Sequence, residues 1–150
     1  MDVETRVPIP GFPGYEASSL GQVISHKQRA ERVLRTWAHQ DGYPMVNLWG
    51  PRGRQGFTVH SLVALAFIGP RPGGMEVCHN DGDCLNNVPS NLRYGTRTEN
   101  EHDKRQHGTH HLARKTRCPK GHPYDEANTY RAPGNERRRY CRACMAARKR

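Results

Sequence analysis

One histidine in the middle of the sequence lies among oxygen-bearing side chains. His79 is followed by Asp81, Asn91 and Asn100. A histidine whose pKa is near neutrality can take a proton from water, and carboxamide and carboxylate oxygens can hold a hard divalent cation such as Mg²⁺ or Mn²⁺. Such a cation can stabilise charge on a phosphate and on its leaving oxygen. The combination predicts metal-assisted phosphodiester hydrolysis, although Asn and Asp clusters also mark ordinary polar turns.

Four residues of the types that bind zinc lie near the C-terminus in two close pairs. Three residues separate Cys118 from His122, two separate Cys141 from Cys144, and 18 residues (123–140) lie between the pairs. Three thiolates and an imidazole suit tetrahedral Zn²⁺, and a closed four-ligand site is structural. Because the segment has few apolar residues, metal binding would supply its folding energy. The alternative is four unrelated residues, with Cys141 and Cys144 as a redox pair.

The net charge of +10 is concentrated in the C-terminal third of the chain. Residues 101–150 carry 14 Lys and Arg against 5 Asp and Glu, a net charge of +9, whereas residues 1–100 carry 10 against 9, a net charge of +1. A basic segment indicates a polyanionic partner, either nucleic acid or an anionic membrane surface. The segment offers little apolar face for a membrane-bound helix, so nucleic acid is the better interpretation.

The composition favours small hydrophobic cores with additional cross-links, such as a bound metal ion, over one large core. Only 34% of the residues are hydrophobic, and 15 Gly and 11 Pro are present. No run of 18 apolar residues occurs, which argues against a membrane-spanning helix. The first residues lack the basic flank and apolar stretch of a secretory signal. Five cysteines are an odd number, whereas a secreted disulfide framework prefers an even one. We therefore expect a cytoplasmic protein whose cysteines bind metal or remain free thiols.

Short strands and helices are expected to position these residues. Residues 43–49 alternate as a strand, and the Gly-rich loop 50–56 joins them to a second strand, so we expect a hairpin whose tip carries Arg52 and Arg54. Residues 60–68 are apolar almost all round, which is typical of a short buried helix. A strand–turn–strand–helix pattern then surrounds the histidine. Two overlapping Ser/Thr-x-x-Glu capping boxes leave the first residue of that last helix open.

The middle of the chain resembles the HNH endonuclease family, in its branch of phage and intron-encoded homing endonucleases. The patterns that carry the resemblance are VHSLVALAF, CHNDGDCLNN, NLRY and RTEN, in the family's order and spacing. The resemblance implies a ββα-metal fold and cleavage of phosphodiester bonds in duplex DNA. It also implies that His79 is the general base, that Asn91 ties the long loop and orients the histidine, and that Asn100 is a metal ligand.

The residue before the general base departs from the family's pattern. The intron-encoded branch often has a ligating Asp at this position, whereas this chain has Cys78. A thiolate is a softer ligand and a poor one for Mg²⁺. Cys78 is therefore either a weak ligand or a structural thiol, and in the second case Asp81 or water completes the metal's coordination.

Both flanking segments also resemble parts of HNH proteins. Residues 9–25, IPGFPGYEASSLGQVIS, resemble an N-terminal motif of the same endonucleases, which implies a small β-rich region that helps to place DNA. The pattern CPKGHPY…CRAC resembles the tail modules of many phage HNH proteins, which implies a basic zinc module that grips DNA phosphates with little sequence choice. The basic residues expected to contact DNA are Arg52, Arg54, Arg93, Arg97, Lys104, Arg105, Arg137, Arg138 and Arg139.

These observations predict an α+β protein with a ββα-metal HNH core, a small β-rich N-terminal region and a small zinc-stabilised C-terminal module. The expected divisions are an N-terminal DNA-positioning region, a nuclease core, a basic linker and a zinc module, at residues 1–57, 58–108, 109–117 and 118–150. The expected activity is nicking or double-strand cleavage of DNA by a monomer or dimer in a bacterial or phage-infected cell. The rival interpretation is a zinc-stabilised DNA-binding or regulatory protein with an inactive nuclease unit, and Cys78 favours it.

Overall fold

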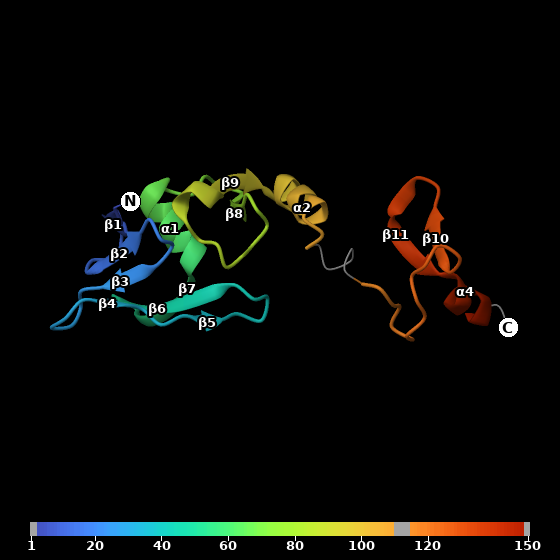
Figure 1. The fold of residues 1–150 in the computed structure, drawn as a ribbon, viewed down its shortest axis with the longest axis horizontal. Coiled ribbons are helices and arrows are strands. Elements are labelled where there is room, and N and C mark those ends of the chain that lie inside the picture. Colours follow the sequence, from blue (N-terminus) through green and yellow to red (C-terminus); the bar gives the residue numbers. More distant parts are fainter. Residues whose placement is uncertain (1–2, 110–114, 149–150) are drawn as a thin grey trace. The chain divides into compact units, whose positions relative to one another are not determined.

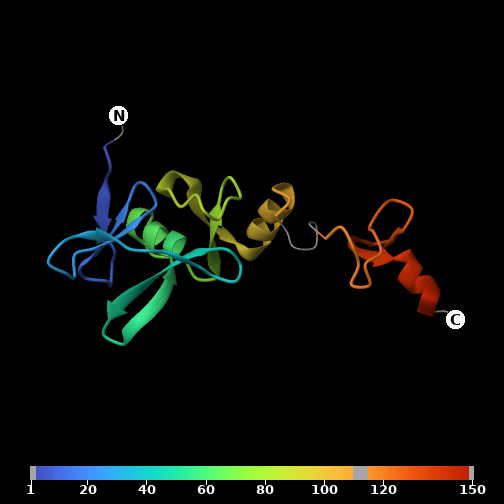
Figure 2. The ribbon, with the colours of Figure 1, turned by 60° about the horizontal axis from the view of Figure 1, so that its bottom comes forward.

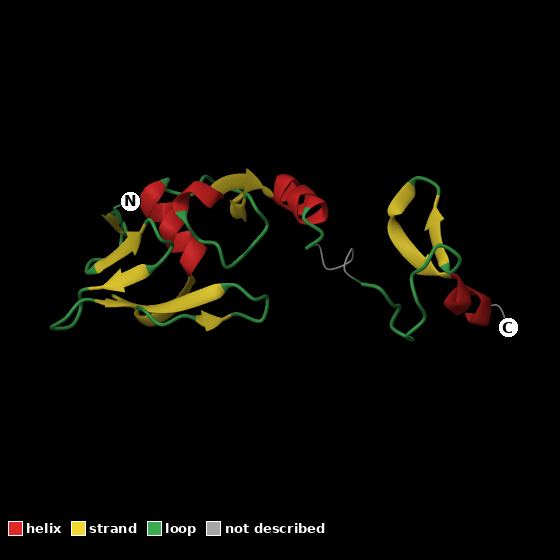
Figure 3. Cartoon of the chain, viewed as in Figure 1, coloured by secondary structure: helices red, strands yellow, loops and turns green. Residues whose placement is uncertain are grey.

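The computed structural model describes residues 3–109 and 115–148, without the side chains of residues 135–137. The chain forms two compact units, residues 1–107 and 108–150. Helices and strands occur in both units (Figure 3), which confirms the predicted α+β class. Over the described ranges, each helix is too short or too polar to cross a membrane.

The first unit begins with a four-stranded antiparallel sheet in the order β1-β2-β3-β4 (Figure 1). Its strands are β1 (Arg6–Pro8), β2 (Tyr15–Ser18), β3 (Val23–Ser25) and β4 (Arg32–Val33). The turn between β2 and β3 contains Gly21, whose φ of 74° lies in the left-handed region that glycine adopts without strain. All three residues of β3 are buried, so the sheet contributes directly to the core.

A three-stranded antiparallel sheet follows, in the order β5-β6-β7. Its strands are β5 (Trp37–Ala38), β6 (Pro44–Gly50) and β7 (Gly53–Thr58). Strands β6 and β7 pair as far as Gly50 and Gly53, so a tight turn joins them and their hairpin extends from the unit (Figure 2). The predicted hairpin is therefore present. The predicted loop 50–56 is wrong, because pairing with β6 draws most of this Gly-rich segment into β7.

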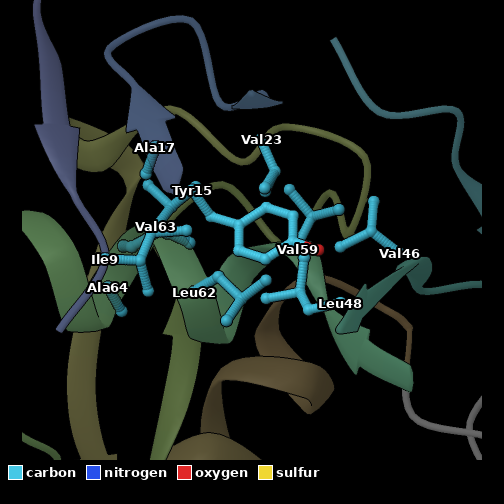
Figure 4. Close-up of a cluster of buried hydrophobic side chains, with 11 residues drawn as sticks. Ile9, Tyr15, Ala17, Val23, Val46, Leu48, Val59, Leu62, Val63 and Ala64 are labelled. Atoms are coloured by element: carbon cyan, nitrogen blue, oxygen red, sulfur yellow. The ribbon is translucent and has the colours of Figure 1, made fainter. Parts of the chain in front are cut away.

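Helix α1 (Val59–Phe67) carries the core of the first unit. Its apolar side chains, including Leu62 and Val63, are buried, as the pattern predicts. They pack against the N-terminal sheet and β6, through residues such as Tyr15 and Leu48 (Figure 4). Burial of each large apolar side chain contributes about 1.5–3 kcal/mol. The N-terminal sheet and the segment after residue 58 therefore stabilise each other through a shared core.

The predicted strand–turn–strand–helix pattern is present as β8 (Met75–His79), β9 (Leu92–Thr96) and α2 (Arg97–Gln106). The two strands pair antiparallel, with His79 opposite Leu92. The Thr96 hydroxyl accepts a hydrogen bond from the backbone N–H of Glu99 (3.2 Å), and the Glu99 carboxylate accepts one from the N–H of Thr96 (2.7 Å). The earlier of the two overlapping capping boxes therefore begins α2.

The second unit contains a two-stranded antiparallel hairpin and a short helix. Strand β10 (Thr129–Ala132) pairs with β11 (Asn135–Cys141), and α4 (Arg142–Arg148) follows at once. The predicted basic linker, 109–117, lies partly outside the described residues, because 110–114 are not described.

Candidate active site and metal cluster

His79 is the last residue of β8, and only 8% of its surface is exposed. Its Nε2 lies 2.9 Å from Oδ1 of Asn87. The Asn87 amide is oriented in turn by its Nδ2, which donates to the backbone carbonyl of Leu85 (3.5 Å). Because an amide oxygen can only accept, Nε2 of His79 donates this hydrogen bond and Nδ1 keeps the lone pair. The ring is therefore oriented to accept a proton at Nδ1.

Two aromatic rings pack against His79. The ring of His60, from α1, meets it edge-on with centroids 5.1 Å apart, and the ring of Tyr43 stacks on it at 6.2 Å. Burial, helped by electrostatic interaction with His79 and Arg71, lowers the pKa of His60 to about 4. Burial also raises the pKa of Tyr43. At neutral pH, two uncharged rings therefore restrict the imidazole of His79, and the sequence had suggested a role for neither of them.

Asn91 closes the loop that follows His79. Its Oδ1 accepts a hydrogen bond from the backbone N–H of Asp81 (3.1 Å), and its Nδ2 donates to the backbone carbonyl of Asn86 (2.9 Å). The side chain is buried at the end of a 3₁₀ turn, Pro89–Asn91, that leads into β9. These bonds join the two ends of the loop that brings an acceptor to His79, which supports the loop-tying role expected of Asn91.

The carboxylate of Asp81 is engaged within the same loop. Its Oδ1 accepts from Nδ2 of Asn91 (2.9 Å) and from the backbone N–H of Asp83 (2.8 Å), and its Oδ2 accepts from Nδ2 of Asn86 (2.7 Å). These hydrogen bonds, the one from Asn86 first, lower the pKa of Asp81 to about 2. The ionised carboxylate therefore organises the loop, and its role as a metal ligand stays a prediction.

Asn100 lies in the first turn of α2, facing β8. Its Nδ2 donates a hydrogen bond to Oε2 of Glu76, a residue that the sequence had not singled out. Cys78, two residues further along β8, is 1% exposed, and a Cβ placed on Gly95 of β9 would lie 3.1 Å from its Sγ. Burial raises the pKa of Cys78, which favours the thiol over the thiolate. Metal-ligand roles for Asn100 and Cys78 stay predictions.

The N-terminal sheet contacts the active-site loop through Gly21. A Cβ at this position would lie 2.6 Å from the backbone carbonyl carbon of Asn87 and 2.9 Å from the backbone nitrogen of Val88. Contacts this short exclude every residue except glycine. The turn between β2 and β3 therefore supports the backbone of the residue that holds His79.

The second unit brings the four predicted zinc ligands together. Nδ1 of His122 lies 3.5, 3.6 and 3.3 Å from the Sγ atoms of Cys118, Cys141 and Cys144, and the sulfurs of Cys118 and Cys144 are 3.8 Å apart. Tetrahedral coordination of Zn²⁺ places sulfurs about 3.8 Å apart and sulfur about 3.5 Å from nitrogen. All four ligand atoms lie within 4.8 Å of one another. The donor set and its spacing therefore fit a tetrahedral ion.

The pKa values of the cysteine thiols also bear on how this cluster would hold a cation. Burial opposes ionisation of Cys141, but hydrogen bonds from the backbone of Cys144 and from Asn128 lower its pKa to about 6. Burial and the neighbouring sulfurs raise the pKa of Cys144 to about 11. Three thiolates so close together repel one another, so without a metal at least one sulfur is favoured as a neutral thiol. A bound metal ion would instead favour the thiolate form of all three.

Comparison with known protein families identifies both parts of the first unit. Residues 57–102, which span α1, β8, β9 and the start of α2, match the family described as HNH endonuclease. This segment is an HNH endonuclease domain. Residues 4–49 match the NUMOD4 motif and cover the N-terminal sheet. The HNH domain and the NUMOD4 motif are the two segments that share the core around α1.

The HNH domain has relatives in phages and prophages. The chain is 36% identical over 103 residues to the DNA endonuclease I-HmuI of Bacillus phage SP01, a match that covers 67% of this chain and 58% of the relative. It is 42% identical over 81 residues to YosQ, named as an SPbeta prophage-derived HNH homing endonuclease of Bacillus subtilis, with coverage of 53% and 46%. The chain thus spans about half the length of these relatives.

A solved structure resembles most of the chain. It is described as DNA binding and cleavage by the HNH homing endonuclease I-HmuI, and it matches with a TM-score of 0.60 at 30% sequence identity. The match covers 72% of this chain and 60% of that one. The fold expected for an HNH domain is therefore confirmed.

The basic residues predicted to contact DNA lie in different surroundings within the HNH domain. Arg93 and Lys104 form ion pairs with acidic residues of α2, the second at 3.1 Å. Arg97 and Arg105 are exposed on α2. Helix α2 therefore presents exposed arginines near both of its ends, beside acidic residues that pair with Arg93 and Lys104.

The β6–β7 hairpin next to the HNH domain carries two more of these residues. Arg52 is exposed in the turn, as predicted, but Arg54 lies in β7 opposite Trp49 and not at the tip. Trp49 is 61% exposed, and Nη2 of Arg54 lies beside the side-chain amide of Asn47. These side chains line an open hollow of about 360 Å³ together with cations such as Lys27. The hairpin thus presents cations and a flat aromatic ring together.

Arginines in the second unit stack on tyrosines. The guanidinium of Arg138 lies 5.2 Å from the ring centroid of Tyr140, and that of Arg139 lies 4.7 Å from the centroid of Tyr124. Cation–π contact orients a guanidinium without neutralising its charge. Arg137 lies in β11, and its side chain is outside the described residues.

Proposed function

We propose that this protein is a metal-dependent endonuclease that hydrolyses phosphodiester bonds in duplex DNA. The observation that carries the proposal is the hydrogen bond between His79 and Asn87 in an HNH domain, because it leaves Nδ1 of His79 available to accept a proton. The net charge of +10 supports a polyanionic substrate. The related solved structure, described as binding and cleaving DNA, supports the choice of nucleic acid.

The positions of the side chains support the following mechanism. His79 takes a proton at Nδ1 from a water molecule in line with the scissile phosphate. Asn87 holds the opposite nitrogen, and the rings of His60 and Tyr43 restrict rotation of the imidazole. Mg²⁺ or Mn²⁺ bound through Asn100 would stabilise charge on the phosphate and on the departing 3′ oxygen. Catalysis then consists of positioning and charge stabilisation.

The second unit has a structural role in this proposal. Zn²⁺ held by Cys118, His122, Cys141 and Cys144 would stabilise its small hairpin. The stacked arginines beside the cluster would contact phosphates, which adds affinity without sequence choice. The setting is the cytoplasm of a bacterial or phage-infected cell, since the matched relatives belong to a phage and a prophage. A monomer would nick DNA and a dimer would cut both strands, which product analysis beside gel filtration distinguishes.

A plasmid-nicking assay with added Mg²⁺ or Mn²⁺ tests the activity. His79→Ala removes the base and is expected to slow cleavage by about 100- to 10,000-fold. Asn100→Ala is expected to abolish the response to the divalent ion. His26→Ala is the matched control, because His26 is half-exposed and paired with Glu16 in the N-terminal sheet. Undiminished cleavage by His79→Ala would overturn the proposed mechanism.

A second candidate function is a zinc-stabilised DNA-binding protein whose nuclease unit is inactive. The buried thiol of Cys78 favours it, because a thiol does not supply the oxygen ligand that Mg²⁺ requires. DNA binding without cleavage at any Mg²⁺ or Mn²⁺ concentration would select this function over the first.

A further inference from the structure

We propose that Glu76, together with Asn100, holds the catalytic divalent ion in place of a ligand at Cys78. The juxtaposition of the Glu76 carboxylate on β8 and the Asn100 amide on α2 carries this inference. It rests on the proposed nuclease function, and it names a ligand that the sequence pattern of the family does not indicate.

The pleat of β8 places Glu76 beside the unusual cysteine. Alternate residues of a strand project to the same face, so Glu76 and Cys78 share the face that α2 covers. Asn100 faces this side of β8 and donates its hydrogen bond to Oε2 of Glu76. A carboxylate and an amide oxygen are ligands that Mg²⁺ and Mn²⁺ accept. The hydrogen bond to Glu76 uses Nδ2 of Asn100, so the amide oxygen of Asn100 remains available as a metal ligand.

Cys78 itself is a packing residue. Its side chain is 1% exposed, and its Sγ lies against Gly95 on the paired strand, where a Cβ would be 3.1 Å away. Sulfur is also the wrong donor for a hard cation. The thiol therefore fills space between β8, β9 and α2, while the carboxylate two residues earlier supplies the charge that an ion needs.

Asp81 is the competing carboxylate. Three hydrogen bonds from Asp83, Asn86 and Asn91 already occupy its two oxygens and hold the loop together. An ion bound there would compete with the hydrogen bonds that order this loop. Among the described residues, the Glu76 carboxylate accepts a hydrogen bond from Asn100 alone, and it has further lone pairs for a metal.

Glu76 and the proposed base, His79, lie on the same strand. Glu76 precedes His79 by three residues on β8, so their Cα atoms are about 10 Å apart at the rise of an antiparallel strand. By the same alternation their side chains leave opposite faces of β8, so an ion at Glu76 would approach the phosphate from the α2 side and His79 from the other side. Tyr43 lies near both groups, since its ring stacks on His79 and the charge of Glu76 contributes to the raised pKa of its hydroxyl.

Manganese binding to the zinc-loaded full chain, measured without DNA by electron paramagnetic resonance and calorimetry, tests the inference. Glu76→Gln keeps the shape of the side chain and removes its charge, and it is expected to weaken Mn²⁺ binding by about tenfold or more. Glu101→Gln is the matched control for loss of one negative charge, because Glu101 follows Asn100 on α2 and pairs with Lys104. Cys78→Ser and Asp81→Asn are expected to bind Mn²⁺ as the unchanged protein does.

Equal Mn²⁺ affinities for Glu76→Gln and Glu101→Gln would overturn the inference, as would a loss confined to Cys78→Ser or Asp81→Asn. Glu76→Asp keeps a shorter carboxylate and is expected to restore part of the affinity, which a merely structural effect of Glu76 would not do. Thermal melts compare the folding of all variants. If the unchanged protein cleaves DNA and Glu76→Gln cleaves it equally well, only this inference is contradicted. If Mn²⁺ binding depends on Glu76 but no cleavage occurs, only the proposed function is contradicted.

Discussion

The Nε2 atom of His79 lies 2.9 Å from Oδ1 of Asn87, eight positions further along the chain. This bond selects the tautomer of the histidine and points its free nitrogen away from the loop. Residues from three other segments then maintain the arrangement. Asn91 closes the loop, Gly21 supports its backbone, and His60 packs against the ring from α1.

Replacement of Asn87 should therefore reduce catalysis without removing the base. Asn87→Ala leaves His79 without its acceptor, and we expect kcat for plasmid nicking to fall by up to about 100-fold, as for other misplaced catalytic groups. The pH profile of cleavage should also change, because both ring nitrogens of His79 then compete for the proton. Asn80→Ala is the control, since Asn80 is exposed and its amide makes only a 3.5 Å bond. An unaltered pH profile for Asn87→Ala would argue for a purely structural role.

Gly21 provides a test of the contact between the NUMOD4 motif and the active-site loop. Gly21→Ala combines a positive φ of 74° with a Cβ 2.6 Å from the backbone of Asn87, so it should lower the free energy of unfolding by about 2–4 kcal/mol and slow cleavage. Gly11→Ala is a matched control, because Gly11 has a φ of 81° but nothing within 4 Å of its added Cβ. Urea titration and the nicking assay should separate the two variants. Equal losses would mean that the contact with Asn87 has no specific effect.

Short-range patterns account for most of what the sequence predicts correctly. The capping box at Thr96 and the apolar run of α1 involve residues within a few positions of each other, so their geometry follows from local preference. The four Cys and His residues of the predicted zinc site also occur as close pairs, and the second unit brings them together, although their binding of zinc stays a prediction. Glu76 could have been found in the same way, since the alternation of β8 places it on the face of Cys78.

Contacts between distant segments were not predictable from these patterns. Tyr43 and His60 reach His79 only because the β6–β7 sheet and α1 fold against β8. The Gly-rich segment after Trp49 has a loop-like composition, but pairing with β6 turns it into a strand and moves Arg54 away from the hairpin tip. Tertiary pairing overrode local preference in that case.

The buried ring of His60 should make stability depend on pH. Its pKa is about 4 in the folded protein and about 6.5 when unfolded, so the unfolded state binds more protons between these values. The free energy of unfolding should therefore fall by up to about 3 kcal/mol as the pH drops from about 6.5 to 4. The groups that face His60 are His79 on β8, Arg71 after α1, and Tyr43. Urea titrations of His60→Gln should show a shallower pH dependence, and an identical slope would contradict the assignment.

Removal of zinc should unfold the second unit and leave the first intact. Purified protein is expected to contain about one equivalent of zinc by plasma emission, and a chelator should abolish the amide dispersion of residues 115–148 while the signals of α1 and β8 persist. Cys144→Ser should lose the metal, because Cys144 lies 3.3 Å from Nδ1 of His122. Cys84→Ser is the control, since the Cys84 thiol lies outside the cluster and donates weakly to the backbone carbonyl of Gly42. Less than about half an equivalent of zinc, or a second unit that stays folded after chelation, would contradict the proposal that zinc stabilises this unit.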